Sequence, residues 1–131
     1  MPFQHREQEQ SDQATRVWAD ATKFHKTAYI PWLEYTNALE YAAQSFPFSA
    51  HRLSTRRQGD YEAARKAFTK AAKSPLDWPE MLWEAWLAFE HSHGSAREIQ
   101  DALDVVERAR AQVEARRAKV SLFFFEFFLT R

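Results

Sequence analysis

Residues 86–98 decide the fold and read Trp-Leu-Ala-Phe-Glu-His-Ser-His-Gly-Ser-Ala-Arg-Glu. Before the glycine, apolar residues recur at helical spacing, which predicts a helix over 77–94. After it, Ser95 is followed three residues later by Glu98, the pattern of a capping box, in which each side chain bonds the backbone of the other residue. This pattern predicts a second helix, which runs from the turn to about residue 119. The stretch therefore predicts two helices joined by a tight turn.

The same helical spacing of apolar residues continues toward the N-terminus. It predicts three further helices, over about 11–24, 28–43 and 60–73. Asp77 is expected to cap the helix that follows, with the Glu80 side chain reaching back to it. Because no segment has the alternating pattern of a strand, the predicted fold class is all-α.

Three segments lack the helical pattern. Residues 1–10 are rich in Gln and Glu and are expected to be disordered, and residues 44–57 are interpreted as a loop or an insertion. Residues 120–131 form a hydrophobic tail that contains 5 of the 11 phenylalanines, and it is expected to lie outside the fold. Its apolar run is about half of the ~20 residues that a membrane-spanning helix needs, so no membrane partner is expected. The helical region is thus predicted to span residues 11–119.

The composition excludes several kinds of active site. With no cysteine, the chain has no disulfide, thiol nucleophile or cysteine-ligated metal. With only 2 glycines, a Gly-rich phosphate-binding loop is not expected. The 18 basic and 18 acidic residues balance, so no overall charge attracts the chain to nucleic acid. His91 and His93 form a weak candidate metal pair with Glu90 or Glu98 nearby, and a solvated turn is the preferred interpretation. We therefore expect no enzymatic activity and no cofactor.

An internal repeat relates the helices to one another. Gly59 and Gly94 lie 35 residues apart, and each is expected at a turn that opens a helix. The pattern Trp-Leu-x-aromatic occurs at residues 32–35 and again at residues 86–89. Two types of helix therefore alternate along the chain. This alternation predicts an α-solenoid of antiparallel helix pairs, with about two and a half repeats.

These residues resemble the half-a-TPR (HAT) repeat. Residues 86–94 are similar to its first helix, with the tryptophan, the second aromatic and the glutamate, and residues 60–75 are similar to its second helix, with the arginine, the aromatic and the closing proline. Across residues 60–119 the similarity is greatest to the last HAT repeats of fungal spliceosome recycling factors. In such repeats the arginine and the glutamate look like packing residues that orient the two helices. On this basis the repeat scaffold comprises Trp18, Trp32, Tyr35, Gly59, Arg65, Phe68, Pro75, Trp86, Phe89, Glu90 and Gly94.

The resemblance implies a protein–protein interaction scaffold with a nuclear location and a role in RNA processing. Its array of helices would present a concave surface to protein partners and would self-associate. The expected process is pre-mRNA splicing, through assembly or recycling of the U4/U6 small nuclear RNP. One alternative is a HAT subunit of the machinery for mRNA 3′-end cleavage and polyadenylation.

Direct RNA binding through the last predicted helix is a further alternative. The basic residues available for phosphate contacts are Arg108, Arg110, Arg116, Arg117 and Lys119. Because Glu107 and Glu114 interleave with them, a solvated helix face is the preferred interpretation.

The aromatic side chains also have two interpretations. Trp83, Trp86 and Phe89 would form either a peptide-binding groove or an inter-helix core, and their helical spacing favours the core. In contrast, Val17 and Trp18 are expected to be partly bare, since their helix lacks a preceding partner helix.

Overall fold

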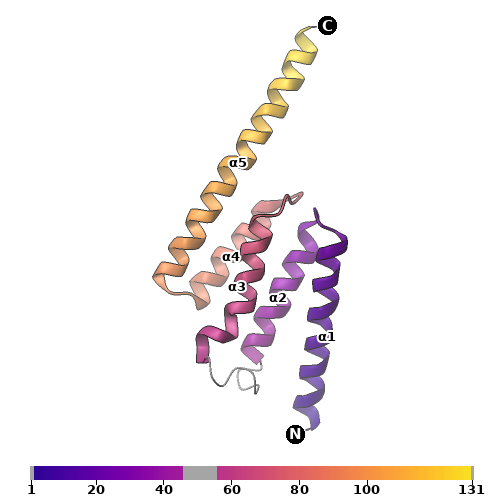
Figure 1. Cartoon of the computed structure of the whole chain (residues 1–131), viewed down its shortest axis with the longest axis vertical. Helices are drawn as coiled ribbons and strands as arrows, with labels where there is room; N and C mark the ends of the chain where they lie inside the picture. The colour runs from indigo at the N-terminus through magenta and orange to yellow at the C-terminus, as the bar shows by residue number, and fades with distance from the viewer. Residues whose placement is uncertain (1, 46–55, 131) are drawn as a thin grey trace.

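The computed structural model describes residues 2–45 and 56–130, which form five helices and no strand (Figure 1). The helices are α1 (Pro2–Phe24), α2 (Tyr29–Ser45), α3 (Arg56–Ala72), α4 (Pro79–His93) and α5 (Ala96–Leu129). Successive helices run antiparallel and pack against each other as pairs. The chain is therefore all-α, as its periodicity predicts.

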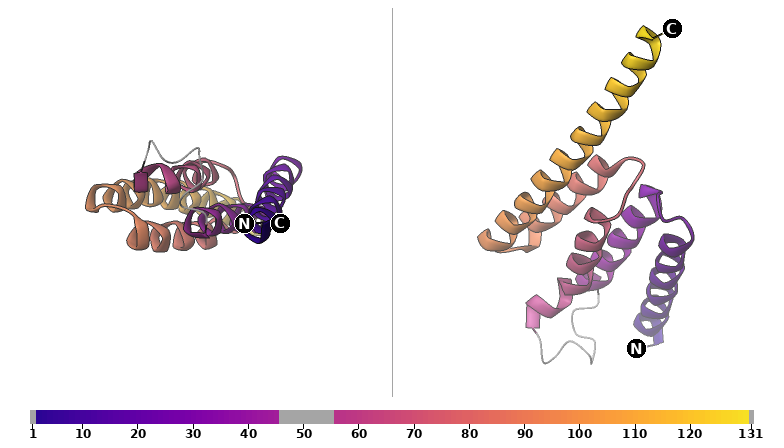
Figure 2. Two further views of the ribbon diagram at one scale, coloured as in Figure 1. Left: turned by 90° about the horizontal axis from the view of Figure 1, so that it is seen from below. Right: turned by 45° about the horizontal axis from the view of Figure 1, so that its top comes forward.

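The helices lie in two rows when they are seen from below (Figure 2, left). One row holds α1, α3 and α5, and the other holds α2 and α4. Helix α2 contacts α1, α3 and α4, and α5 contacts α3 and α4. Among the described residues, however, α1 and α3 make no contact with each other, although both pack on α2. The α1 and α3 helices therefore flank an open space above α2.

The hydrophobic core lies where α2, α3, α4 and α5 meet. Helix α4 contributes the largest share of its buried residues, because its apolar face lies between α3 on one side and α5 on the other. The buried residues of this cluster are Trp32, Ala64, Phe68, Ala71, Leu82, Trp83, Trp86, Phe89, Ala102 and Val106. Among the described residues, helix α1 contributes none to this cluster and contacts α2 alone.

Two predicted helix starts are wrong. Helix α1 begins at Pro2 and not at Ser11, which differs from the disordered segment expected over residues 1–10. Glutamine and glutamate have good helix propensity, and proline is tolerated in a first turn, so nothing in this segment stops a helix. Helix α3 begins at Arg56, so Gly59 lies inside its first turn and not at a turn before it. Most of the expected insertion over 44–57 lies outside the described residues.

The end of α5 also differs from the prediction. The helix continues past Lys119 to Leu129, because the sequence between them has no glycine or proline to break it. Its large apolar side chains beyond Lys119 are all exposed, from 43% of the surface of Phe127 to 74% of that of Phe128. This end of the helix projects away from the other four helices (Figure 1). No helix in the described part of the chain is long and apolar enough to cross a membrane.

The start of α4 is built differently from the predicted capping box. Trp78 occupies the N-cap position, and no side chain caps the helix there. Instead, Asp77 Oδ1 accepts hydrogen bonds from its neighbour Trp78 N and from Tyr29 N at the start of α2, both at 2.9 Å. The Glu80 carboxylate pairs with Arg117 on α5 at 2.8 Å. Both predicted cap residues thus connect α4 to other helices.

Candidate functional site

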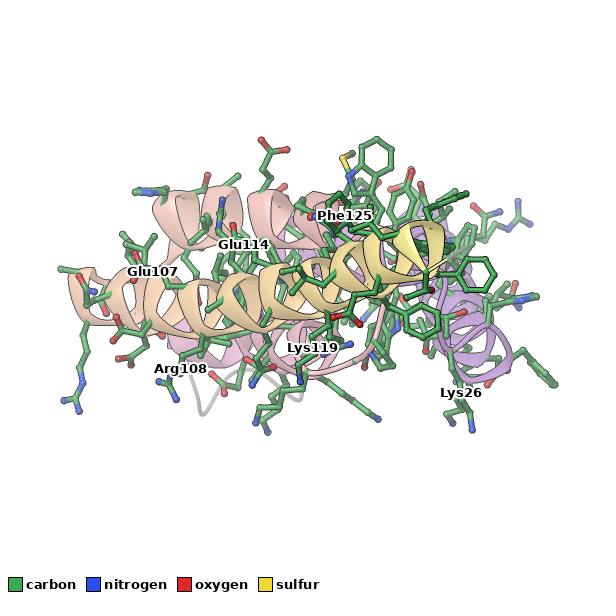
Figure 3. The ribbon with its side chains drawn as sticks, turned by 90° about the horizontal axis from the view of Figure 1, so that it is seen from above. Lys26, Glu107, Arg108, Glu114, Lys119 and Phe125 are labelled. Carbon is green, nitrogen blue, oxygen red and sulfur yellow. The ribbon has the colours of Figure 1, made fainter. Side chains whose placement is uncertain are left out.

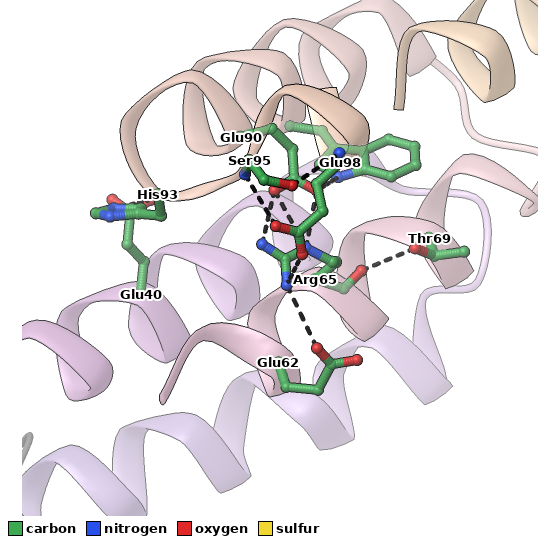
Figure 4. Close-up of polar contacts among 9 residues, drawn as sticks. Glu40, Glu62, Arg65, Thr69, Glu90, His93, Ser95 and Glu98 are labelled. Atoms are coloured by element: carbon green, nitrogen blue, oxygen red, sulfur yellow. Dashed lines mark hydrogen bonds and ion pairs between the residues drawn. The ribbon is translucent and has the colours of Figure 1, made fainter. Parts of the chain in front are cut away.

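A buried ion pair joins α3 to α4. Arg65 Nε donates to Glu90 Oε2 at 2.9 Å, and Arg65 Nη2 donates to Glu90 Oε1 at 2.9 Å, so the guanidinium holds both carboxylate oxygens (Figure 4). Only 1% of the Glu90 side chain is exposed. Trp86 Nε1 also donates to Glu90 Oε2, at 3.3 Å. A buried carboxylate needs such partners, because burial removes its hydration.

Arg65 extends this pair to α5. Its Nη1 lies 2.7 Å from Glu98 Oε2 on α5 and 3.3 Å from Glu62 Oε2, one turn earlier on α3. The hydrogen bond to Glu90 and the three negative charges raise the pKa of Arg65 above its ordinary value, against the opposing effect of burial. Arg65 is the residue on α3 that the resemblance selected. Its guanidinium therefore connects α3 to α4 and α5.

The turn between α4 and α5 has the predicted capping box. Glu98 N donates to Ser95 Oγ at 3.3 Å, and Ser95 N donates to Glu98 Oε1 at 2.9 Å. Gly94 precedes it in an extended conformation with φ −94°, so backbone conformation does not require glycine here. The lack of room for a side chain does require glycine, because a Cβ at Gly94 would lie 2.7 Å from Glu90 Oε1 and 2.8 Å from Glu90 O. Gly94 is therefore needed to let the chain pass beside the buried carboxylate.

This turn makes stability depend on pH. The hydrogen bond from the Ser95 backbone lowers the pKa of Glu98, and the Ser95 hydroxyl and the Arg65 charge lower it further. A glutamate with a lowered pKa in the folded state stabilises the fold above its unfolded-state pKa of about 4.3, and this stabilisation is lost as pH falls through the folded-state pKa. We expect Glu98→Gln to reduce the free energy of unfolding by about 1 kcal/mol at pH 7, with a smaller reduction at pH 3.

Urea unfolding followed by circular dichroism at both pH values measures this effect. Glu114→Gln on the exposed part of α5 is the matched control and should change little at either pH. A loss from Glu98→Gln that is equal at the two pH values would show that the ionised carboxylate is not the stabilising group.

The aromatic residues of α4 belong to the core and not to a groove. Trp83, Trp86 and Phe89 are between 2% and 4% exposed. The Phe89 ring lies 5.3 Å from the ring of Phe68 and 5.9 Å from that of Tyr61, between ring centroids. The preferred interpretation of their spacing is therefore confirmed. On α1, Val17 is 63% exposed and Trp18 is half-buried, as expected.

The two histidines at the end of α4 lie in different surroundings. His91 is exposed, whereas His93 stacks on the Tyr61 ring with 4.0 Å between ring centroids. His93 Nε2 also lies 3.7 Å from Glu40 Oε2 on α2 (Figure 4). It lies 3.3 Å from Gln44 Nε2 on the same helix. No group of three or more potential metal ligands occurs in the described ranges. His93 thus serves as a packing residue between α2, α3 and α4.

The five basic residues predicted on α5 do not form one patch. Arg117 pairs with Glu80 at 2.8 Å, and the Arg110 guanidinium lies over the Trp83 ring at 5.6 Å from its centroid. Figure 3 shows Arg108 and Lys119 on one side of the α5 ribbon and Glu107 and Glu114 on the other. Glu107 and Glu114, the acidic residues predicted to interleave with the basic ones, thus lie on a different side of the helix from Arg108 and Lys119.

Arg108 and Arg116 line a small pocket of about 350 Å³ between α5 and the end of α3. Lys73 lines the same pocket, together with the polar side chains of Ser74 and Gln112. None of its lining residues is acidic. The pocket thus brings together Arg108 and Arg116, which were among the five predicted residues, and Lys73, which was not. No carboxylate in its lining would repel a bound anion.

A larger cavity of about 650 Å³ lies between α1 and α3, above α2. We call it the lysine-rimmed groove. Trp32 and Tyr35 of α2 line its floor, and small side chains of α1 and α3 line its walls. Four exposed lysines surround it: Lys23, Lys26, Lys66 and Lys70. Ser74 and Pro75 also line it.

Sequence reasoning placed three residues of this groove in the repeat scaffold, namely Trp32, Tyr35 and Pro75, and missed all four lysines. Lys23 lies at the end of α1 and Lys26 in the turn that follows it, whereas the other two lysines lie on α3, beyond α2 in the sequence. No single stretch of sequence therefore contains all four. A local signal did exist, since Lys66 and Lys70 are four residues apart and share one face of α3.

Comparison with known proteins finds no family model, no curated protein and no solved structure that matches this chain. The resemblance to HAT repeats therefore rests on the residues and on their contacts described above.

Proposed function

We propose that the chain is a protein–protein interaction scaffold of the HAT-repeat type that acts in nuclear RNA processing. The observation that carries the proposal is the contact between the two residues that the resemblance selects on different helices: Arg65 on α3 binds Glu90 on α4 through both carboxylate oxygens. Two residues that orient the paired helices of a repeat are expected to contact each other directly, as Arg65 and Glu90 do. The alternating helices, packed as antiparallel pairs in two rows, agree with a stack of such repeats.

A scaffold binds partners through exposed surfaces, and this chain has several. The lysine-rimmed groove is open between α1 and α3, and the end of α5 exposes Phe123, Phe125 and Phe128. Contiguous exposed apolar surface of this kind is typical of interaction sites. Splicing, through the U4/U6 small nuclear RNP, is the process that the resemblance favours.

The proposal is tested by purifying a tagged chain from cells after mild cross-linking. We expect a nuclear location and enrichment of U4 and U6 RNA together with their proteins. Enrichment of cleavage and polyadenylation factors instead would place the scaffold in mRNA 3′-end formation. Enrichment of neither set would overturn the proposal. Phe89→Ala, which removes a core side chain, is the control for binding by an unfolded chain.

Direct RNA binding is a second candidate, and the pocket lined by Lys73, Arg108 and Arg116 favours it. On this candidate we expect micromolar binding of labelled single-stranded RNA in fluorescence anisotropy, with a steep dependence on salt. Arg108→Gln/Arg116→Gln should weaken binding. It should also flatten the plot of log K against log[salt] by about 0.7 for each phosphate that the variant no longer neutralises.

Arg97→Gln/Lys119→Gln is the matched control for this experiment, since both positions are exposed and lie outside the pocket. Equal losses from the two double variants would show that RNA binds α5 only through its general charge. Absence of binding at low salt would exclude the candidate and leave the scaffold.

A further inference from the structure

We propose that the lysine-rimmed groove binds an acidic amphipathic peptide segment of a partner protein, in which Asp or Glu residues flank a large apolar side chain. This inference deepens the proposed scaffold function and rests on it. It concerns which chemical class of partner the surface between α1 and α3 accepts.

The charge of the groove indicates an acidic partner. Lys23 and Lys26 lie on the α1 side, and Lys66 and Lys70 lie on the α3 side. All four are exposed, and none of them forms an ion pair with a carboxylate in the part of the chain that the structure describes. The lining contains no acidic residue. In a chain whose total charge is balanced, this concentration of one sign selects for acidic side chains at the rim.

The interior of the groove indicates an apolar anchor. Its walls carry Ala19, Ala63 and Ala67, whose short side chains leave the space open. Its volume of about 650 Å³ is within the range of ~300–1,000 Å³ that is typical of ligand-binding cavities. A leucine or phenylalanine side chain that enters the groove would contact these alanines and the accessible part of Tyr35. Burial of such a side chain adds a hydrophobic contribution to binding beyond that of the rim charges.

The same interior disfavours RNA as the occupant. Single-stranded RNA binds through bases that stack on the exposed face of an aromatic ring. Trp32 is only 6% exposed, so its ring face is covered by the fold. Tyr35 is half-buried and packs near Trp32, with ring centroids 6.3 Å apart. The groove therefore offers lysines for phosphates but no free stacking platform for bases.

The probe for the test is a fluorescein-labelled peptide of the sequence Asp-Glu-Phe-Asp-Glu-Leu-Leu-Asp-Glu, measured by fluorescence anisotropy with the full chain. Two further probes are the same peptide with Ser in place of Phe and Leu, and a single-stranded RNA of equal charge. We expect the first probe to bind at least tenfold more tightly than either of the others. Equal binding of the Ser peptide would overturn the proposal, and so would tighter binding of the RNA that is lost when the four lysines are replaced.

Two variants locate the binding. Replacing Lys23, Lys26, Lys66 and Lys70 by Gln removes the rim charge and should raise the Kd of the acidic peptide about tenfold, since each exposed ion pair contributes only modestly to affinity. Ala63→Trp keeps the four lysines but fills the groove, and it should abolish binding of the acidic peptide. Unchanged binding in Ala63→Trp would overturn the proposal. Circular dichroism establishes that both variants are folded, and Arg97→Gln/Lys119→Gln is the charge control.

The result is separable from the test of the proposed function. A chain that is recovered with nuclear RNA-processing proteins but binds no acidic peptide refutes the groove proposal alone. A chain that binds the peptide through the groove, yet is recovered with no such proteins, supports the groove proposal and refutes the assignment to RNA processing.

Discussion

Glu90→Gln is expected to lower the free energy of unfolding by about 3 kcal/mol, the lower end of the range for breaking a buried ion pair. The variant keeps the shape of the side chain but leaves the Arg65 guanidinium, which is 15% exposed, without its main counter-charge. The loss stays near the lower end because Glu98 still lies 2.7 Å from Arg65 Nη1. Urea unfolding followed by far-UV circular dichroism measures it.

Two further variants separate the ion pair from the shape of its site. Glu107→Gln makes the same chemical change on the exposed face of α5 and should cost less than about 0.5 kcal/mol, which is usual for surface substitutions. The double variant Arg65→Met/Glu90→Leu removes both charges and should recover most of the loss, because an apolar pair often replaces a buried ion pair without penalty. A double variant that is as unstable as Glu90→Gln would show that shape, and not the unpaired charge, causes the loss.

The sequence predicted most reliably what its local patterns determine. Helix type follows from the spacing of apolar residues, and the Ser95–Glu98 capping box depends only on residues within one turn. Both were predicted correctly. Asp77 and Glu80 show the same pattern and were predicted wrongly, because their carboxylates find partners on α2 and α5. A capping motif competes with tertiary contacts that the motif itself does not reveal.

Helix ends were predicted less well, for a related reason. At Ser11 and at Lys119 the predicted boundary rested on a change of composition, from polar to amphipathic or from charged to apolar. Neither change contains a glycine or proline that would stop a helix, and the helices α1 and α5 run through both points. A shift in composition therefore marks where packing changes and not where helical backbone ends.

Of the candidate sites, one was predicted from the sequence and the others depend on how the helices pack. Arg65 and Glu90 were selected because the resemblance gives them a joint role, and the structure places them in contact. The lysine-rimmed groove could not be derived, because it requires that α1 and α3 pack on α2 without meeting each other. The different surroundings of the α5 arginines also depend on a neighbouring helix. Glu80 on α4 pairs with Arg117, and the Trp83 ring on α4 lies under Arg110.

Phe89→Ala is expected to reduce the free energy of unfolding by about 3–5 kcal/mol. Phe89 is 2% exposed and its ring contacts those of Phe68, Tyr61 and His93. Its removal leaves a cavity between α3 and α4. Domains commonly have only ~5–15 kcal/mol of stability, and this short chain has a small core, so much of the variant should be unfolded at physiological temperature. Thermal and urea unfolding by circular dichroism measure the reduction.

Phe128→Ala is the matched control, because it makes the identical change at a side chain that is 74% exposed near the end of α5. It should change the free energy of unfolding by less than about 0.5 kcal/mol, since this side chain lies outside the core. Phe89→Leu is the second control and should cost less than Phe89→Ala, because it fills part of the cavity. If Phe128→Ala were as destabilising as Phe89→Ala, the exposed end of α5 would have to pack against the folded chain or a second copy, and the core would not be confined to α2–α5.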